Sequence, residues 1–477
     1  MSHGRGDHND EETPLLRVQN GDTSHKPTQL PTIQISVLVV PWIAESIVAH
    51  SISPYINQLV RELPIVGGDG RRVGYYTGII ISLHFVAEAV TSFHWNRLSD
   101  HIGRKPVFLM CLTGTIISIV LFGLSRSFLA LVLSRCLHGA MKGHIGVVKS
   151  VMAELTDETN IVRGFSLLLM TWAIGYSLSP FIGGVLSKPQ DRWPGVFSGP
   201  FWDEYPYFLP CLVSAAISCL SFIIVAIFLE EVLGEGSGDA LDVRPEDAQK
   251  PLPLRSVLTR PVLISLANYA MISLLEMTSV ALIPLIWSTS IQFGGLDLSP
   301  VSIGLWMSVY GCMDGIFQFS VSPHILGHFG PRYAFITSVA VSAASHIMFP
   351  LENLVRRHAA GGTNATTWML ILLHLFKPCG PLWWALTNDL PGAMYIYIVS
   401  AAPSKRSLGA VNGLAQTVSS VQRTVGPLAA DSLFAFSVTN NVLGGKFVYV
   451  VLLALSCIGL CTATRLPRDR WRHGISQ

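Results

Sequence analysis

Residues 207–230 read YFLPCLVSAAISCLSFIIVAIFLE, a run whose first charged side chain is Glu230. Inside a lipid bilayer a helix satisfies its own backbone hydrogen bonds, and about 20 apolar residues cross the roughly 30 Å of hydrocarbon. The stretch therefore predicts a membrane-spanning helix. The composition agrees, because half of the chain is hydrophobic and only 13% is charged, against roughly 25% in ordinary soluble proteins.

Eleven further stretches meet the same criterion, so we expect an all-α membrane protein with twelve transmembrane helices in two six-helix bundles. The other predicted spans are 33–56, 74–95, 106–125, 127–149, 165–187, 261–286, 301–322, 333–351, 370–400, 408–436 and 445–464. Residues 231–260 are rich in Gly, Ser and Pro with charges of both signs, which is typical of a linker. The predicted parts are a tail 1–32, bundles 33–230 and 261–464 on either side of this linker, and a tail 465–477.

The distribution of Lys and Arg predicts the orientation. With the N-terminus inside, the inner segments carry 18 of these residues and the outer loops 9, which places both termini in the cytoplasm. The first thirty residues lack an apolar signal sequence, so the first span acts as the uncleaved insertion signal. The sequon at Asn364 then falls in an outer loop and predicts glycosylation.

Several function classes are excluded by what the sequence lacks. A net charge of +2 without runs of like charge does not suit nucleic acid. The eight cysteines show no metal-ligand spacing, so we expect neither a metal nor another cofactor. Without a GxSxG elbow, a P-loop or an HExxH motif, the chain is not expected to be an enzyme. These absences favour secondary transport without ATP hydrolysis.

Residues 94–106, HWNRLSDHIGRKP, lie between the second and third spans and resemble motif A of the major facilitator superfamily. In that motif a short loop carries charges that pair in one arrangement of the two halves and separate in the other. The resemblance implies a gating loop. Its residues here are Arg97, Asp100, Gly103, Arg104 and Lys105. The alternative is a plain basic loop on the cytoplasmic side.

Two further segments resemble motifs of the same superfamily. Residues 135–143, RCLHGAMKG, are similar to motif B, and residues 175–184, GYSLSPFIGG, are similar to motif C, which is associated with antiporters that export. The antiporter-like positions are Gly175, Ser179, Pro180, Gly183 and Gly184. Close packing of helices through small residues explains both segments equally well.

The resemblance covers the chain after residue 30 and implies the major facilitator fold. Residues 53–59, 145–150, 205–210 and 406–416 are similar to the fungal and plant branch that includes the zinc-induced facilitator-like transporters. Membership of this branch implies proton-coupled transport. Its fungal relatives include exporters of secondary metabolites.

Ionisable residues inside the spans are the candidate functional groups, because each costs about 2.5–3.5 kcal/mol at the bilayer centre. In the fourth span Arg135, His138, Lys142 and Lys149 share one face of a continuous helix. We expect this stripe to line a central cavity. Alternatively, Arg135 and Lys149 reach the two interfaces by snorkelling, and only Lys142 is deep.

Acidic residues in the first two spans are candidates for proton coupling. Glu45 lies near the middle of the first span with His50 five residues later, and His84 and Glu88 are spaced i, i+4 in the second. A carboxylate opposite the basic stripe can gain and lose a proton as a cavity opens and closes. The alternative for both glutamates is a structural ion pair within the first bundle.

In the second half, Asp314 and Gln318 are spaced i, i+4 and are expected to face the cavity together. Arg423 and Asp431 are interpreted as a structural pair with their neighbours. The other ionisable residues are Glu276, Lys377 and Asp389. The aromatic residues that either form a box for an amine or ring-bearing substrate, or lie at the interfaces, are Trp172, Tyr176, Trp306, Tyr310, Trp383 and Trp384.

The sequence thus predicts a secondary active transporter, a proton-coupled antiporter that exports a small organic molecule or secondary metabolite by alternating access. We expect it to act as a monomer in the lipid bilayer, with protons as the coupling ion. The alternatives are a non-transporting solute sensor and a vacuolar carrier for a metal chelate. Residues 11–16, EETPLL, resemble a vacuolar sorting signal, so the plasma membrane and the vacuolar membrane both stay open.

Overall fold

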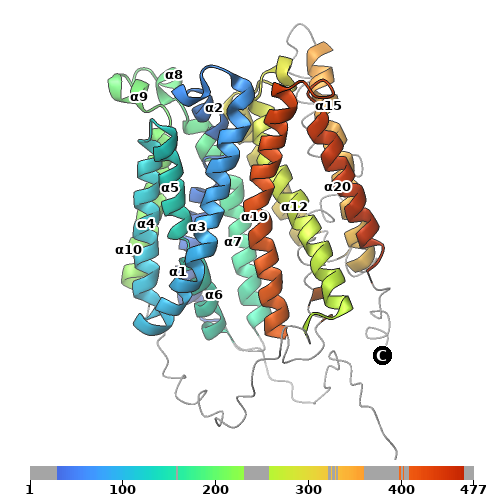
Figure 1. Cartoon of the computed structure of the whole chain (residues 1–477). Coiled ribbons are helices and arrows are strands. Elements are labelled where there is room, and N and C mark those ends of the chain that lie inside the picture. The colour runs from blue at the N-terminus through green and yellow to red at the C-terminus, as the bar shows by residue number, and fades with distance from the viewer. Residues whose placement is uncertain are drawn as a thin grey trace, which may run out of the picture.

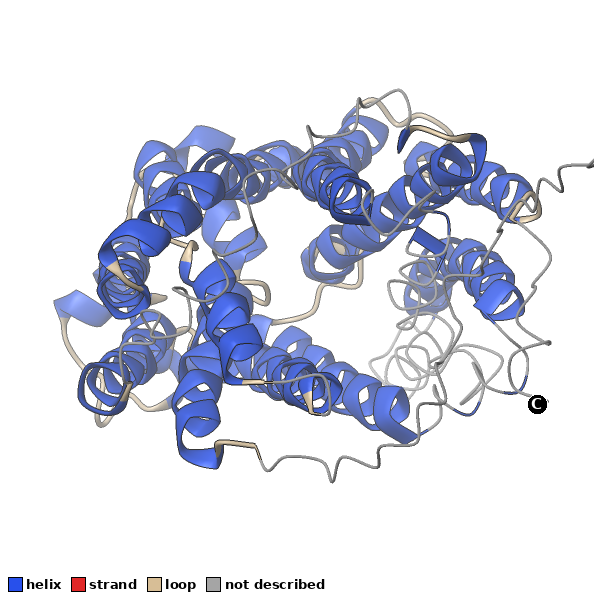
Figure 2. Ribbon diagram, turned by 90° about the horizontal axis from the view of Figure 1, so that it is seen from below, coloured by secondary structure: helices blue, strands red, loops and turns tan. Residues whose placement is uncertain are grey.

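The computed structural model describes residues 30–156, 160–229, 257–320, 324, 328, 331–358, 397, 398, 401 and 408–466. The regular elements in these ranges are all helices (Figure 2), so the predicted all-α architecture is confirmed. Several predicted features lie outside them: nearly all of both tails, the linker up to residue 256, almost all of the tenth span and the sequon. The individual residues concerned are Asn364, Lys377, Trp383, Trp384 and Asp389.

Seven helices make the six crossings of the first half. They are α1 (Thr32–His50), α3 (Val73–Ile102), α4 (Arg104–Gly123), α5 (Phe128–Ala140), α6 (His144–Leu155), α7 (Ile161–Leu186) and α10 (Phe208–Phe228). The fourth crossing is shared by α5 and α6. The opening sequence run forms α10, as expected.

Five described crossings follow in the second half. They are α12 (Arg260–Ser288), α13 (Pro300–Ser320), α15 (Pro331–His358), α19 (Leu408–Thr439) and α20 (Phe447–Ala463). Most of the described helix pairs in contact belong to one half, but α13 packs chiefly on α7 of the other half. The two halves meet where α7 packs on α13 and where α3 packs on α19.

Three short helices mark one end of the molecule, which we call the upper end because it is uppermost in Figure 1. They are α2 (Ile56–Arg61), α8 (Pro189–Arg192) and α9 (Pro200–Glu204). The opposite, lower end carries α6 and the junction of α3 with α4 (Figure 1). By the predicted orientation, the lower end faces the cytoplasm.

The surface is suited to lipid. Within the described chain, seven helices are long and apolar enough to cross a membrane. Large apolar side chains also point outward along them, including Val90 at 64% exposure and Phe93 at 68% on α3, and Ile227 at 65% on α10. An apolar surface of this extent needs a covering, and the acyl chains of a bilayer supply it.

The predicted fourth span, 127–149, was wrong as a single continuous helix. It is interrupted at residues 141–143, and α6 continues to Leu155. The carbonyl of Ala140, which a continuous helix would offer to the amide of residue 144, instead accepts the indole N–H of Trp95 at 2.5 Å. The turn then uses tighter i to i+3 bonds, from the amide of Lys142 to Gly139 and from Ile145 to Lys142.

Candidate functional site

The centre of the site is the carboxylate of Glu45 on α1, which is 1% exposed. Its Oε1 lies 3.4 Å from Nε2 of His138 on α5, and its Oε2 lies 3.3 Å from Nε2 of His144 on α6. Both distances are within the range of an ion pair, but the atoms are not aligned for a hydrogen bond. A carboxylate buried in this way needs a nearby positive charge to stay ionised.

Arg135 extends this network on α5. Its Nη1 lies 3.0 Å from Nδ1 of His138, and its backbone carbonyl lies 3.1 Å from Nδ1 of His84 on α3. The imidazole rings of His84 and His138 stack with centroids 4.9 Å apart at 23°. Two parallel imidazoles in contact disfavour a positive charge on both.

Lys142, in the turn between α5 and α6, forms a second ion pair. Its Nζ donates to Oε2 of Glu88 on α3 at 3.1 Å and lies 5.8 Å from the ring centroid of Phe85. Nε2 of His84 lies 3.9 Å from the same Glu88 oxygen. The structure therefore brings six residues singled out from the sequence into one network. They are Glu45, His84, Glu88, Arg135, His138 and Lys142.

The network depends on close contact between α3 and the interrupted fourth crossing. A side chain at Gly139 would collide with the backbone of His84, and one at Gly143 would collide with Trp95. The small residues of the motif B segment are therefore required by packing. This role is the alternative that the sequence left open for them.

His50 lies apart from the ion pairs and among aromatic rings. Its ring packs edge-on against Tyr176 at 4.8 Å and Trp172 at 5.7 Å, both on α7, and its Nδ1 lies 2.9 Å from the carbonyl of Ser46. Trp42 lies 5.5 Å from Trp172 on the other side. These rings could contact a ring-bearing substrate.

The second half supplies fewer described contacts. Asp314 lies on α13 one turn after Gly311, and at Gly311 the helix backbone packs against Tyr176. Gln318 belongs to the same helix, but its side chain is outside the described part. We expected Asp431 to form a structural pair with neighbouring side chains. In the structure, its Oδ2 accepts a hydrogen bond at 3.5 Å from Thr77, which belongs to the first half.

The motif A segment forms the end of α3 and the start of α4. Gly103 joins the helices at a φ of +105°, which a residue with a side chain rarely adopts. Nη1 of Arg104 donates to Ser99 at 2.7 Å. Arg97 is exposed on α3. Lys105 follows in α4, and the side chain of Asp100 lies outside the described part.

The motif C segment packs on both halves of the protein. Gly175 lies against Ser46 and Gly183 against Ser51, both in the first half. Gly184 faces Gly304 of α13 so closely that neither position has space for a side chain. We call this contact between α7 and α13 the Gly184 seam. The carbonyl of Pro180 also lies against Gly304 there. Ser179 donates to the carbonyl of Tyr176 at 3.2 Å.

His144 is the one member of the Glu45 cluster that sequence reasoning missed. On a continuous helix it would lie off the Arg135 stripe, and it enters the cluster because the helix is interrupted immediately before it. The signal that could have revealed the interruption is Trp95, a large residue on the facing helix that packs on Gly143.

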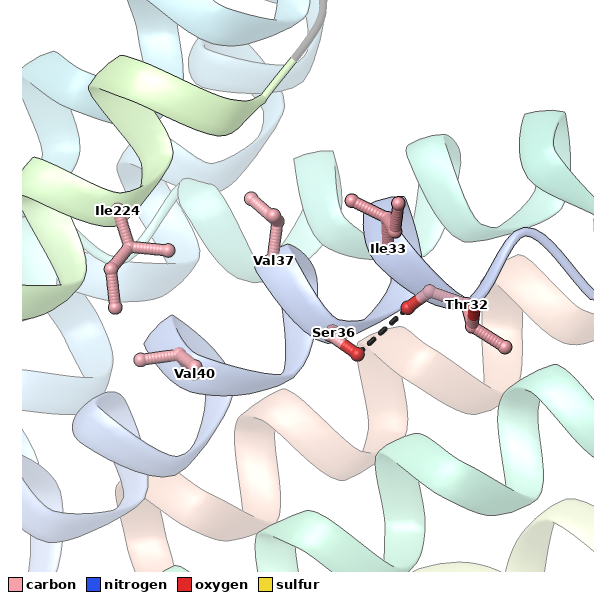
Figure 3. Close-up of a pocket in the computed structure, with 6 residues that line it drawn as sticks. All are labelled: Thr32, Ile33, Ser36, Val37, Val40 and Ile224. Carbon is pink, nitrogen blue, oxygen red and sulfur yellow. Dashed lines mark hydrogen bonds between the residues drawn. The ribbon is translucent and has the colours of Figure 1, made fainter.

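Figure 3 shows an apolar groove of about 330 Å³ between α1 and α10. Its lining residues are Thr32, Ile33, Ser36, Val37, Val40 and Ile224. The one hydrogen bond drawn there joins Ser36 to the carbonyl of Thr32 at 2.7 Å. The groove contains none of the ionic groups above, so we do not assign the transport site to it.

Comparison with known proteins is consistent with this geometry. A sequence model described as Major Facilitator Superfamily matches residues 74–427. The chain is 28% identical to the major facilitator-type transporter psiT2 of Psilocybe cyanescens, with 94% of this chain and 93% of the relative covered. It is 27% identical to the efflux pump azaK of Aspergillus niger, with 96% and 95% covered.

A plant relative and a solved structure extend the comparison. The protein ZINC INDUCED FACILITATOR-LIKE 1 of Arabidopsis thaliana is 25% identical, with 86% of each chain covered. The crystal structure of a D-xylose-proton symporter superposes with a TM-score of 0.65 at 12% identity, covering 92% of this chain and 99% of the other. This structural likeness concerns the fold alone.

Proposed function

Since this chain belongs to the Major Facilitator Superfamily and has its twelve-helix fold, we propose that it is a proton-coupled antiporter that exports a small organic molecule. The observation that carries the proposal is the buried Glu45 with its two histidine neighbours. A carboxylate without water contact is costly to keep charged. Its retention in a membrane helix is explained if it exchanges a proton during the transport cycle.

The contacts between the halves at the upper end support alternating access. Nη2 of Arg61 donates to the carbonyl of Ser288 at 2.6 Å, and the guanidinium of Arg71 lies 5.8 Å from the ring centroid of Phe293. Together with the Gly184 seam, these contacts close the upper end. We propose that the Arg61 and Arg71 contacts break when the halves rock about the Gly184 seam, and that the solute then leaves on that side.

The direction of transport rests on two further arguments. The α7 segment resembles the motif associated with export, and a relative that aligns over nearly the whole chain is named an efflux pump. Export from the cytoplasm also requires the proposed orientation, with both termini inside and the division into bundles 33–230 and 261–464. The plasma membrane or the vacuolar membrane would serve equally.

A bare metal ion is a less favoured cargo than a small organic solute or a metal chelate. No group of three His, Cys, Asp or Glu in the described ranges is arranged to hold a metal ion. A metal would therefore have to enter with its own ligands. The small organic solute remains the leading proposal.

Flux measurements in proteoliposomes test the proposal. Ethidium, fluorescein and zinc citrate serve as an amine, an organic anion and a chelate, each with and without a pH gradient. We expect gradient-dependent flux of at least one probe, and loss of that dependence in Glu45→Gln. Absence of flux for every related compound tried would contradict transport, whereas binding without flux would favour the sensor.

A further inference from the structure

Resting on the proposed proton coupling, we propose that His144 is the charged partner of Glu45 and that a proton arriving at Glu45 releases α6 from α1. His144 then acts as a positioning residue, because it sets when the carboxylate accepts a proton. The assignment distinguishes it from His138, which touches the same carboxylate.

His138 is held neutral by its other neighbour. A guanidinium can only donate hydrogen bonds, so Nδ1 of His138, 3.0 Å from Nη1 of Arg135, must accept. A ring nitrogen that accepts carries no proton. His138 therefore has its single proton on Nε2, the atom that faces Glu45.

His144 has the opposite surroundings. Its Nδ1 lies 3.4 Å from the carbonyl of Met141, and its Nε2 lies 3.3 Å from the Glu45 carboxylate. Both neighbours offer only lone pairs, so either neutral tautomer would place two lone pairs against each other. The doubly protonated imidazolium satisfies both sides and supplies the positive charge that Glu45 needs.

The elements around His144 offer no other described anion. From α4, the thiol of Cys111 and the ring of Phe108 face the imidazole. From α5 comes the neutral His138, which touches the same Glu45 carboxylate, and Arg135 lies against the other side of the His138 ring. On α3, Glu88 is already bonded to Lys142. Among the described residues, the ion pair of Glu45 and His144 is thus the ionic link between α1 and α6, in addition to their apolar packing.

The position of this pair gives it a mechanical role. Glu45 holds α5 through His138 and α6 through His144, on the two sides of the turn at 141–143. A proton from the cytoplasmic water that binds a Glu45 oxygen forms the neutral acid and cancels the attraction to His144. The imidazolium then has no ionic partner on α1, and only apolar packing holds α6 to α1 beyond the turn. Loss of that proton restores the pair.

Solid-state NMR of the full chain in lipid nanodiscs, labelled with ¹⁵N-histidine, tests the assignment without any substrate. At pH 8, exposed histidines with an ordinary pKa of about 6.5 are neutral, so a buried imidazolium stands out among the 15 histidines. We expect one such signal to disappear in His144→Gln and to become neutral in Glu45→Gln. His138→Gln should remove a neutral signal instead.

Two results would overturn the assignment: loss of the imidazolium signal in His138→Gln, or its persistence in His144→Gln. If a histidine variant does not fold, the through-space correlation between the imidazolium nitrogen and a glutamate carboxylate in the wild type decides the question. Its absence there would also overturn the proposal.

Flux separates the failure of this inference from failure of the proposed function. In proteoliposomes loaded with a transported probe, His144→Gln should shift the pH of half-maximal flux by about 1–3 pH units, the effect of removing an opposite charge. His138→Gln should shift it less. An NMR result as expected with pH-independent flux would retain the ion pair and reject proton coupling. Equal shifts in both variants would reject His144 as the positioning residue.

Discussion

Glu45 is enclosed by protein on all sides, and its two oxygens face two different helices. The residue types of this network follow from the sequence, because ionisable groups inside a span are costly and must be paired. The sequence does not reveal which cation pairs with which carboxylate. That choice depends on a single backbone carbonyl, at Ala140, being taken by Trp95.

The ion pair of Lys142 with Glu88 leads to a prediction about stability. Lys142 is 7% exposed and Glu88 18%, so removing one partner leaves a mostly buried charge without a counter-ion. Lys142→Gln should destabilise the protein by about 3 kcal/mol or less, since breaking fully buried pairs costs about 3–5 kcal/mol. The double variant Lys142→Gln/Glu88→Gln should lose less stability than Lys142→Gln alone, because it leaves no unpaired buried charge. Thermal melting in detergent checks the order, and a double variant that is less stable than the single one would contradict it.

Asp69, in the loop before α3, permits a prediction about pH. Arg71 donates to Asp69 and holds the pKa of that carboxyl below its ordinary value of 3.8. A lowered pKa means that the interaction stabilises the loop above about pH 3.8 and is lost as the pH falls through the lower, folded-state value. Asp69→Asn should therefore leave the pH dependence of flux between pH 5 and pH 8 unchanged. A change in that range would show that this surface pair takes part in coupling.

Among the elements, the fourth crossing shows where sequence patterns fail. Its apolar periodicity correctly predicts a helix, and its lower end extends only a few residues beyond the expected position. The interruption depends on packing against α3, which involves residues some 45 positions away in the chain. A periodicity argument considers one segment at a time and cannot detect such a contact.

The glycines of α7 give a prediction for helix packing. A side chain at Gly183 would overlap the backbone of Ser51, whereas one at Gly413 of α19 meets nothing within 4 Å. Gly183→Ala should force α1 and α7 apart and lower the yield of monodisperse protein and its melting temperature. Gly413→Ala should be neutral or stabilise by up to about 1 kcal/mol, since alanine favours helices. Similar melting temperatures for the two variants would contradict this packing.

For the whole molecule, the contact of Arg61 with Ser288 is predicted to hold the upper end closed. Arg61→Ala should shift the population toward an upper-open arrangement, measured as longer distances between spin labels at the upper ends of α3 and α13. The matched control is Arg126→Ala, because Arg126 pairs with Glu204 inside the first half. Equal distances in wild type and Arg61→Ala, or an equal lengthening in both variants, would exclude the contact as a lock.

The backbone contact between Gly184 and Gly304 lies close to the upper tip of α7. From there to the lower tip at Ile161 the helix extends roughly 35 Å, at 1.5 Å per residue. In the rocking motion that we propose, this contact acts as a fulcrum near one tip of α7. A small tilt of the helix at the fulcrum then becomes a wide displacement at its far tip. In the transport cycle that we propose, the length of this arm then limits the bulk of the cargo admitted from below, while the fulcrum itself needs only a slight adjustment.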